Sequence, residues 1–368
     1  MTDQNLNSAR RRVLSGMRPT GKLHLGNYMG ALKNWVDLQN ATHPDGSPMY
    51  ECYFFIADYH ALTTDYADTS MLKENIAEVM LDFLAAGLDP AKSVIFRQSK
   101  VPAHFELNDL LAMITPLSWL ERVPTYKDQI EQLKEKDLAT FGFLGYPLLQ
   151  SADILVYQPT FVPVGQDQAA HVEITREIAR RFNHLYQGQP DPTSTLRPTG
   201  DPGGLVLPDV MPEILPEPQV LLTPSPKLPG TDGRKMSKSY KNTILLSDPE
   251  PEVRAKLKTM VTDPARIRRT DPGDPDVCPV FDLHKVFSSE EKQQEVRIGC
   301  TSAGIGCIQC KGWLADAVVT QLAPMQERRR YFEGHPKEVA AILEDGKLRA
   351  NERANKTMDE VRKAMGID

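Results

Sequence analysis

The feature that most constrains the fold of this chain is a repeated order of apolar strand, turn and helix. The first unit consists of the apolar stretch Val13–Met17, a turn that contains Gly21 and Gly26, and a helical pattern of apolar residues. Further strand-like stretches begin at Tyr50, Ser93 and Thr160. Strands that alternate with helices indicate a parallel sheet. We therefore predict an α/β fold with a Rossmann-like, doubly wound parallel sheet over residues 13–246.

Length and composition limit the classes of protein to which the chain can belong. Its 368 residues, of which 40% are hydrophobic, suffice for two soluble globular domains. The N-terminus is polar and no apolar run reaches the length of a membrane span, so we expect a cytoplasmic protein with no membrane segment. The net charge of −6 confines any nucleic-acid site to a local basic patch. Residues 1–12 are expected to form a flexible tail.

A short loop, Gly233–Ser239, places two lysines three residues apart directly after a turn-forming run. Such a loop can bring the compact charges of Lys235 and Lys238 onto a polyphosphate. A solvated basic loop is the alternative for a lysine pair taken by itself. The run Lys-Met-Ser-Lys-Ser resembles, residue for residue, the lysine loop of class I aminoacyl-tRNA synthetases.

The first turn of the chain carries a second motif, Pro19–Asn27. The N-terminus of the following helix presents unpaired N–H groups that suit an anion, although many glycine-bearing turns are only tight connections. The motif resembles the His-Ile-Gly-His signature in the form used by tryptophanyl-tRNA synthetases, except that it ends in Asn27. Asparagine can still donate a hydrogen bond to a phosphate oxygen, so we expect Asn27 to position a nucleotide but not to act as an acid.

The resemblance implies an ATP site built from both motifs and from the stretch after Thr160–Val164. Lys235 and Lys238, with Mg²⁺, would supply charge to the departing phosphates, while His24 and Asn27 would hold the triphosphate. The residues expected to bind ATP are Arg18, Pro19, Thr20, Gly26, Asn27, Gly165, Gln166, Asp167, Lys235, Met236, Ser237, Lys238 and Ser239.

A helical stretch, residues 146–157, has one apolar face and a second face of polar and aromatic residues. Asp153 on this second face could accept a hydrogen bond from an indole N–H, because a directed hydrogen bond discriminates better than an apolar pocket. Pairing of Asp153 with a structural arginine or a backbone amide is the alternative. The stretch resembles the tryptophan-binding helix of tryptophanyl-tRNA synthetases. The resemblance implies a tryptophan pocket formed by Asp153, Tyr146, Gln150, His60, Val162, Val164 and Gln168.

Two further segments complete the expected organisation. Residues 189–229 are rich in proline, and we expect an extended crossover that ends in a last strand near Val220. Residues 247–368 should form a smaller helical domain, whose basic residues between Arg254 and Arg269 would contact tRNA phosphates; a solvated helix face would look similar. The resemblance implies that this is the anticodon-binding domain and that the closing helices pack on it.

Four of the five cysteines cluster within this second domain. Four thiolates suit structural zinc or an iron–sulfur cluster, and they are supplied here by Cys278, Cys300, Cys307 and Cys310. Thiolates are soft ligands for both metals, so the ligand type does not distinguish zinc from iron. A redox pair of Cys307 and Cys310 is a further alternative. A subset of bacterial tryptophanyl-tRNA synthetases is similar here and carries a [4Fe-4S] cluster, although its first gap is one residue longer. We therefore expect a [4Fe-4S] cluster, with Zn²⁺ as the alternative.

The resemblance covers nearly the whole chain and implies a tryptophan–tRNA ligase that works as a homodimer. Such an enzyme activates L-tryptophan with ATP to tryptophanyl-adenylate and pyrophosphate, then transfers tryptophan to the 3′ end of tRNA(Trp). A tyrosyl enzyme of the same class is the nearest alternative, and it would need a polar pair that reaches a phenol hydroxyl. A non-catalytic RNA-binding or iron–sulfur sensing protein on this fold would not need Lys235, Lys238, His24 and Asp153 intact.

Overall fold

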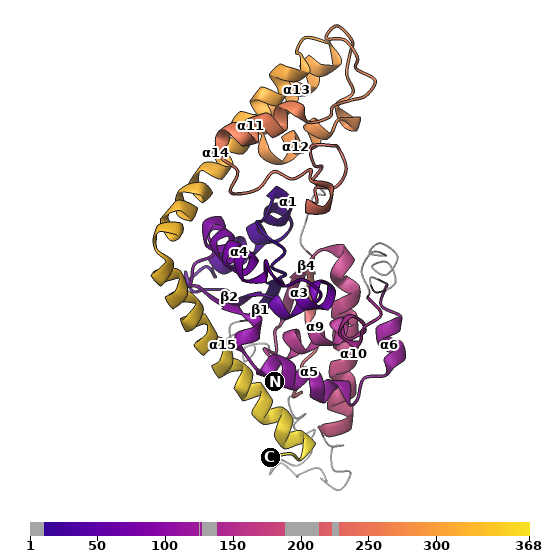
Figure 1. Ribbon diagram of the computed structural model, residues 1–368, viewed down its shortest axis with the longest axis vertical. Helices are drawn as coiled ribbons and strands as arrows, with labels where there is room; N and C mark the ends of the chain where they lie inside the picture. Colours follow the sequence, from indigo (N-terminus) through magenta and orange to yellow (C-terminus); the bar gives the residue numbers. More distant parts are fainter. Residues whose placement is uncertain (1–10, 125, 127–137, 188–212, 223–227) are drawn as a thin grey trace, which may run out of the picture.

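The computed structural model describes residues 11–124, 126, 138–187, 213–222 and 228–368. A five-stranded parallel sheet lies at its centre, in the strand order β3-β2-β1-β4-β5 (Figure 1). The strands are β1 (Arg11–Met17), β2 (Tyr50–Ile56), β3 (Ser93–Arg97), β4 (Phe161–Val164) and β5 (Gln219–Leu222). The chain builds outward from β1 to β3 and then returns to the other side of β1, which confirms the predicted doubly wound sheet.

The first strand is longer than the sequence predicts. Arg11 and Arg12 pair in register with Tyr50 and Glu51 of β2, so β1 begins two residues before Val13. These two arginines therefore belong to the sheet and not to a tail, whereas residues 1–10 lie outside the described part of the chain. Most of the predicted proline-rich crossover, residues 189–229, also lies outside it, but β5 supplies the expected last strand.

Helices cover both faces of the sheet. Among the described residues, the α-helices before β5 are α1 (Leu25–Asn27), α2 (Lys33–Asn40), α3 (Asp58–Asp65), α4 (Leu72–Ala86), α5 (Ala103–Ala112), α6 (Leu117–Glu121), α8 (Phe141–Leu144), α9 (Tyr146–Leu155) and α10 (Ala169–Tyr186). Successive side chains of a strand point to opposite faces. Phe54 and Ile56 of β2 accordingly pack in the core beside α4, while Tyr53 and Phe55 pack in the core beside α5, α9 and α10.

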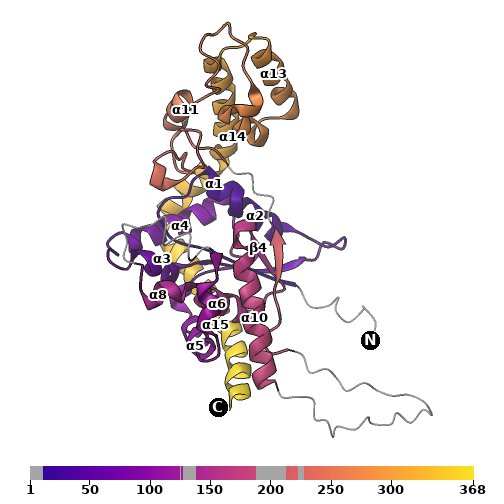
Figure 2. The ribbon, with the colours of Figure 1, turned by 90° about the vertical axis from the view of Figure 1, so that its right-hand side faces the viewer.

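Five helices follow the lysine loop: α11 (Glu250–Thr259), α12 (Pro279–Phe287), α13 (Glu290–Thr301), α14 (Cys307–Gly334) and α15 (Pro336–Met365). Figures 1 and 2 show α11, α12, α13 and the first part of α14 as a helical body beyond one end of the sheet domain. The long helix α14 then runs along α4, and α15 continues along β3 and α5.

The last helix packs differently from the sequence-based expectation. We expected the closing helices to pack on the helical domain, but α15 packs on the sheet. A Cβ added at Gly346 would lie 1.8 Å from the carbonyl oxygen of Ile95, so only glycine permits this approach of α15 to β3. Ala350, Ala354 and Met358 are fully buried in the same core. No helix in the described ranges is long and apolar enough to cross a bilayer.

Candidate active site

Two adjoining cavities open where the order of the sheet reverses, between β1 and β4. In doubly wound sheets ligands bind outside the carboxyl ends of the strands at this point. One cavity has a volume of about 800 Å³ and the other of about 580 Å³. Arg18, Thr20 and Asn27, which follow β1, line both cavities. The two cavities can therefore hold two ligands whose reacting groups meet beside the turn after β1.

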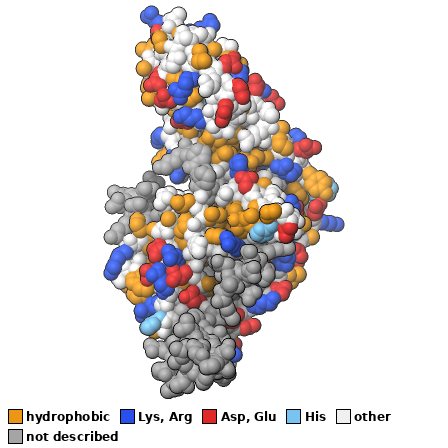
Figure 3. All heavy atoms as spheres, turned by 180° about the vertical axis from the view of Figure 1, so that it is seen from behind, with side chains coloured by type: hydrophobic (Ala, Val, Ile, Leu, Met, Phe, Trp, Pro, Cys, Tyr) orange, Lys and Arg blue, Asp and Glu red, His pale blue; other side chains and the backbone are white. Residues whose placement is uncertain are grey.

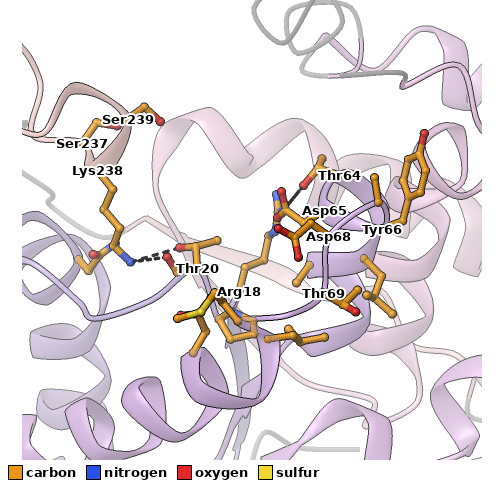
Figure 4. Close-up of a pocket in the computed structure, with 18 of the residues that line it drawn as sticks. Arg18, Thr20, Thr64, Asp65, Tyr66, Asp68, Thr69, Ser237, Lys238 and Ser239 are labelled. Carbon is orange, nitrogen blue, oxygen red and sulfur yellow. Dashed lines mark hydrogen bonds and ion pairs between the residues drawn. The ribbon is translucent and has the colours of Figure 1, made fainter. Parts of the chain in front are cut away.

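The larger cavity joins the two predicted nucleotide motifs. Lys238, 217 residues beyond Gly21, donates from Nζ to the carbonyl oxygens of Gly21 at 2.8 Å and Thr20 at 3.0 Å. Figure 4 shows Lys238 reaching from the lysine loop toward Thr20, with Ser237 and Ser239 beside it. Burial lowers the pKa of Lys238 to about 8. His24 and Pro19 line the same cavity, so the expected convergence of the two motifs is observed.

His24 and Asn27 cap each other at the start of α1. The backbone N–H of Asn27 donates to Nδ1 of His24 at 3.3 Å, and the backbone N–H of His24 donates to Oδ1 of Asn27 at 3.1 Å. Burial and then the charges of Lys238 and Lys235 lower the pKa of His24 to about 4. The imidazole is therefore neutral near pH 7 and carries its proton on Nε2. A Cβ at Gly26 would lie 2.9 Å from this ring, which explains the glycine.

Arg18 lies at the junction of the two cavities. A terminal nitrogen of its guanidinium donates to the hydroxyl of Thr64 and lies 3.4 Å from Oδ2 of Asp65. Burial lowers the pKa of Arg18, although the Asp65 carboxylate acts in the opposite direction. Within the described ranges its buried Nε has no hydrogen-bond partner. Because buried donors are nearly always paired, this N–H is available to an anionic ligand.

The lysine loop is held in place by the buried side chain of Met236 and by a hydrogen bond to Asn242. Met236 was predicted to bind ATP, but its side chain is only 4% exposed and packs in the apolar core beneath the loop. Asn242 was not predicted, and its Oδ1 accepts from the backbone N–H of Ser237 at 2.8 Å. Lys235 is exposed and lines neither cavity, although its charge acts on His24.

The smaller cavity brings together every residue predicted to bind tryptophan. These are Asp153, Tyr146, Gln150, His60, Val162, Val164 and Gln168. Tyr146 is 8% exposed, and its ring packs against the rings of Phe143 and His171. Asp153 is 1% exposed. The cavity thus combines a buried carboxylate with aromatic and aliphatic walls.

Asp153 accepts four hydrogen bonds. Nε2 of Gln98 donates to both carboxylate oxygens at 2.7 and 2.9 Å. Nδ1 of His104 lies 2.7 Å from Oδ1, and Nε2 of His60 lies 2.8 Å from Oδ2. Burial alone would raise the pKa of Asp153, but the bonds and charges of His104 and His60 outweigh burial and lower it. The carboxylate is therefore ionised and fully coordinated before any ligand enters.

Sequence reasoning missed Gln98 and His104. Gln98 follows β3, and His104 lies in the first turn of α5. Polar residues are common at such helix starts, so the sequence around Gln98 and His104 gives no signal of a binding site. Gly165 and Gln166 line neither cavity, and the side chain of Asp167 lies outside the described part of the chain. The expected contact of these three residues with ATP therefore stays a prediction.

The four clustered cysteines lie together in the helical body. Cys278 precedes α12, Cys300 lies near the end of α13, and Cys307 and Cys310 lie in the first turn of α14. Burial and the neighbouring thiols raise the pKa of Cys310 to about 12. Nη1 of Arg266 lies 3.6 Å from Sγ of Cys300. As the side chains stand, no group of three or more His, Cys, Asp or Glu residues in the described ranges is arranged to hold a metal ion.

Comparisons with known proteins identify the family of this chain. A family model for class I tRNA synthetases (W and Y) matches residues 6–323. The tryptophan–tRNA ligase of Thermotoga maritima is 50% identical, with coverage of 97% of this chain and 99% of that protein. The enzyme of the same name from Ralstonia nicotianae is 49% identical, with coverage of 97% and 98%.

A solved structure is similar over the whole fold. The tryptophanyl-tRNA synthetase of Campylobacter jejuni, in complex with ADP and tryptophan, has a TM-score of 0.79 and 33% identity, and the match covers 96% of this chain and 99% of that one. Both the sequence and the fold of this chain therefore lead to one conclusion: it belongs to the tryptophan–tRNA ligase family of class I tRNA synthetases.

Proposed function

We propose that this chain activates L-tryptophan with ATP to tryptophanyl-adenylate and pyrophosphate, then transfers tryptophan to the 3′ end of tRNA(Trp). The observation that carries the proposal is the pair of adjoining cavities that share Arg18, Thr20 and Asn27. One cavity is lined by the two nucleotide motifs, and the other contains a buried carboxylate between aromatic and aliphatic walls. The Campylobacter jejuni relative binds both ADP and tryptophan.

In the first step a carboxylate oxygen of tryptophan attacks the α-phosphorus of ATP. A bond forms between these two atoms, the bond from the α-phosphorus to the bridging oxygen breaks, and pyrophosphate leaves. No side-chain nucleophile is needed, so the protein contributes positioning and charge. Mg²⁺ bound to ATP would neutralise part of the phosphate charge. In the second step a terminal hydroxyl of tRNA attacks the carbonyl carbon, and AMP leaves.

Residues of the larger cavity would hold the triphosphate. Lys238 would turn from Gly21 and Thr20 to the departing phosphates, and Lys235 would approach from the exposed part of the loop. Neutral His24 would donate from Nε2 instead of serving as an acid, because its pKa is about 4. Asn27 would donate from its amide nitrogen, since its amide oxygen already caps His24.

Arg18 would bind the substrates where they meet. It lines both cavities, and its Nε has no partner within the described ranges. A guanidinium there can bond the tryptophan carboxylate and an α-phosphate oxygen and bring the two reacting groups together. In the smaller cavity Asp153 would accept the indole N–H, and Tyr146, Val162 and Val164 would enclose the ring.

The helical body, within residues 247–368, would bind the anticodon region of tRNA. A cavity of about 560 Å³ in this body is lined by Arg266, Arg268 and Arg269. Figure 3 shows that basic and acidic side chains are interspersed on the reverse face of the molecule, which fits a local basic patch better than a broad one. Substitution of Arg268 or Arg269 should weaken tRNA charging and leave tryptophan activation unchanged; reduced activation would count against this assignment.

The four thiols would hold a [4Fe-4S] cluster, with Zn²⁺ as the alternative. The first support is that Cys278, Cys300 and Cys307 lie close enough to Cys310 to raise its pKa. The second is the donor set, since four thiolates suit either metal. A positive charge from Arg266 beside Cys300 would stabilise an anionic cluster. Anaerobically purified protein should be brown and contain iron and sulfide. Stoichiometric zinc without iron would overturn the assignment of iron and support zinc.

We also propose a cytoplasmic homodimer, in line with the family resemblance. The large apolar side chains of Met113, Leu117 and Phe141 are 70%, 56% and 81% exposed on or beside α5, α6 and α8. Substitution of Phe141 by Asp should shift the mass measured by light scattering from dimer to monomer. A monomeric wild-type protein would overturn this proposal.

Amino-acid-dependent exchange of pyrophosphate into ATP tests the function as a whole. The wild-type chain should catalyse this exchange with tryptophan and not with the other amino acids, and it should then charge tRNA(Trp). Exchange that depends on tyrosine would favour the tyrosyl alternative. The absence of exchange with any amino acid would favour a non-catalytic RNA-binding role.

A further inference from the structure

One turn of α14 is connected by hydrogen bonds to the first nucleotide motif, through Asp82 of α4, and to the segment that follows the lysine loop. Arg329 of α14 is 5% exposed, and its Nη1 donates to Oδ1 of Asp82 in α4 at 2.5 Å. Nη2 of Arg329 donates to Oε2 of Glu78 at 2.5 Å. The other oxygen of Asp82 accepts from the backbone N–H of Leu23 at 2.7 Å. Because Leu23 directly precedes His24, the buried ion pair fixes the backbone of the first motif.

The same turn of α14 holds the segment that follows the lysine loop. Nε2 of Gln326 donates to the carbonyl oxygen of Asp248 at 2.8 Å. This segment also pairs with the first motif, since the backbone N–H of Leu246 donates to the carbonyl oxygen of Leu23 at 2.9 Å. Asp82 and Leu246 thus bond the N–H and the carbonyl of Leu23 respectively, and α14 bonds both Asp82 and the segment that contains Leu246.

The side chains of this network line neither cavity, although the charge of Asp82 partly offsets the effect of burial on the pKa of Lys238. Asp82 is fully buried, and burial raises its pKa. The hydrogen bond from Leu23 and the charge of Arg329 lower the pKa but do not cancel the effect of burial. Burial of the Asp82 carboxylate and the Arg329 guanidinium is costly, and an apolar arrangement of similar volume would often be as stable. An apolar arrangement would, however, give the N–H of Leu23 no acceptor.

We propose that the turn Gln326–Arg329 of α14 is a positioning element of the adenylation site. Arg329 holds Asp82, Asp82 fixes the backbone before His24, and Gln326 fixes the segment after the lysine loop. The C-terminal helices thereby take part in shaping the ATP site without contact with ATP. This inference rests on the proposed function, since its assay is tryptophan-dependent pyrophosphate exchange.

Two double variants of the full-length chain test the proposal. Asp82→Leu with Arg329→Met removes the ion pair and the acceptor for Leu23, whereas Asp82→Asn with Arg329→Met removes the charges but keeps an acceptor oxygen. Both variants remove the two most deeply buried charges together, and the side chains of Glu78 and Glu333, which are 20% and 46% exposed, can be solvated by water. Both should therefore fold, as circular dichroism can verify. The Leu variant should lose about 10- to 100-fold in kcat/KM for ATP, because a small displacement of a positioned group is enough for such a loss. The Asn variant should recover most of that loss.

Tryptophan binding distinguishes positioning from general damage. The Kd of tryptophan, measured by calorimetry, should stay within about twofold of wild type in both variants. Arg330 is an exposed arginine directly after this turn, and Arg330→Met should behave as wild type in all measurements. Equal ATP kinetics in the Leu and Asn variants, or a loss of tryptophan affinity that matches the loss for ATP, would overturn the proposal. Lack of exchange by the wild-type chain would instead contradict the proposed function.

Discussion

The charge of Lys238 should set both the rate of pyrophosphate exchange and its alkaline limit. Its Nζ lies 2.8 Å from the carbonyl oxygen of Gly21, at the wall of the cavity that would hold the triphosphate. Removal of one preorganised donor to a developing charge costs about 3 kcal/mol, which corresponds to roughly 150-fold in rate. We expect Lys238→Ala to lose about this factor in kcat. The Kd of tryptophan should not change, because Lys238 does not line the smaller cavity.

The pKa of Lys238, about 8, adds a pH signature to this prediction. The amine carries its charge below pH 8 and loses it above, so kcat/KM for ATP should fall as pH rises through about 8. The fall in kcat should occur at higher pH, because bound phosphates favour the charged amine. Lys238→Arg keeps its charge at every accessible pH. The pH profile of Lys238→Arg should therefore have no alkaline limb, even if the rate of this variant is lower than that of the wild type.

Exchange of labelled pyrophosphate into ATP, measured across this pH range, gives the result. Lys241→Ala is a matched control, since Lys241 is an exposed lysine just beyond the loop that does not line the cavity. The reasoning is refuted if Lys238→Arg keeps the same alkaline limb as the wild type. It is also refuted if Lys238→Ala retains the wild-type rate.

Three further predictions follow from the geometry of the two cavities. Arg18→Met should raise the KM of both ATP and tryptophan in the exchange assay, because Arg18 lines both cavities; a rise for one substrate alone would contradict its place at the junction. Asp153→Asn should weaken tryptophan binding by about tenfold or more in calorimetry and leave the KM of ATP unchanged, since it replaces an acceptor oxygen by a donor. Because the pKa of His24 is about 4, His24→Asn should lower the rate of exchange but leave the shape of the pH profile near neutral pH unaltered; loss of an acidic limb there would show that His24 titrates.

The sequence was informative wherever a function depends on residues close together in the chain. The turn after β1 and the lysine loop are contiguous motifs, and their meeting follows from the strand order of a doubly wound sheet. The same holds for the tryptophan pocket. Tyr146, Gln150 and Asp153 lie on one face of α9, and this face borders the smaller cavity.

The sequence could not show which distant side chains support these motifs. His104 and Gln98 reach Asp153 from other elements, and Arg329 reaches Asp82 across 247 residues. A hydrogen bond between distant residues leaves no local pattern, because its partners are brought together only by packing. The predicted packing of α15 on the helical domain was wrong for the same reason. The contact of α15 with β3 depends on the space left at Gly346. The motif alone also does not show that the side chain of Met236 points inward, so its expected contact with ATP stays a prediction.

The coordination of Asp153 changes how selection of tryptophan should be understood. A site that bonds a substrate N–H rejects an analogue without it when a buried acceptor is left unpaired. Here Asp153 already accepts bonds from Gln98, His104 and His60. Gln98 and His104 are fully buried, whereas the side chain of His60 is 12% exposed and lines the cavity. His60 is therefore the partner that an indole N–H would displace, and it can return when the ligand has no N–H.

It follows that His60 should reduce discrimination against an analogue of tryptophan in which sulfur replaces the indole N–H. With the analogue bound, His60 keeps Asp153 paired, so the wild-type protein avoids the cost of an unsatisfied carboxylate oxygen. In His60→Ala that cost is incurred, and an unpaired buried acceptor is worth about 1–3 kcal/mol, or roughly five- to 150-fold in affinity. The dissociation constant of the analogue divided by that of tryptophan, both measured by competition calorimetry, should rise by a factor in this range in His60→Ala. An unchanged or smaller ratio would mean that the indole does not compete with His60 for Asp153, and that the aromatic and aliphatic walls select the ring without this carboxylate.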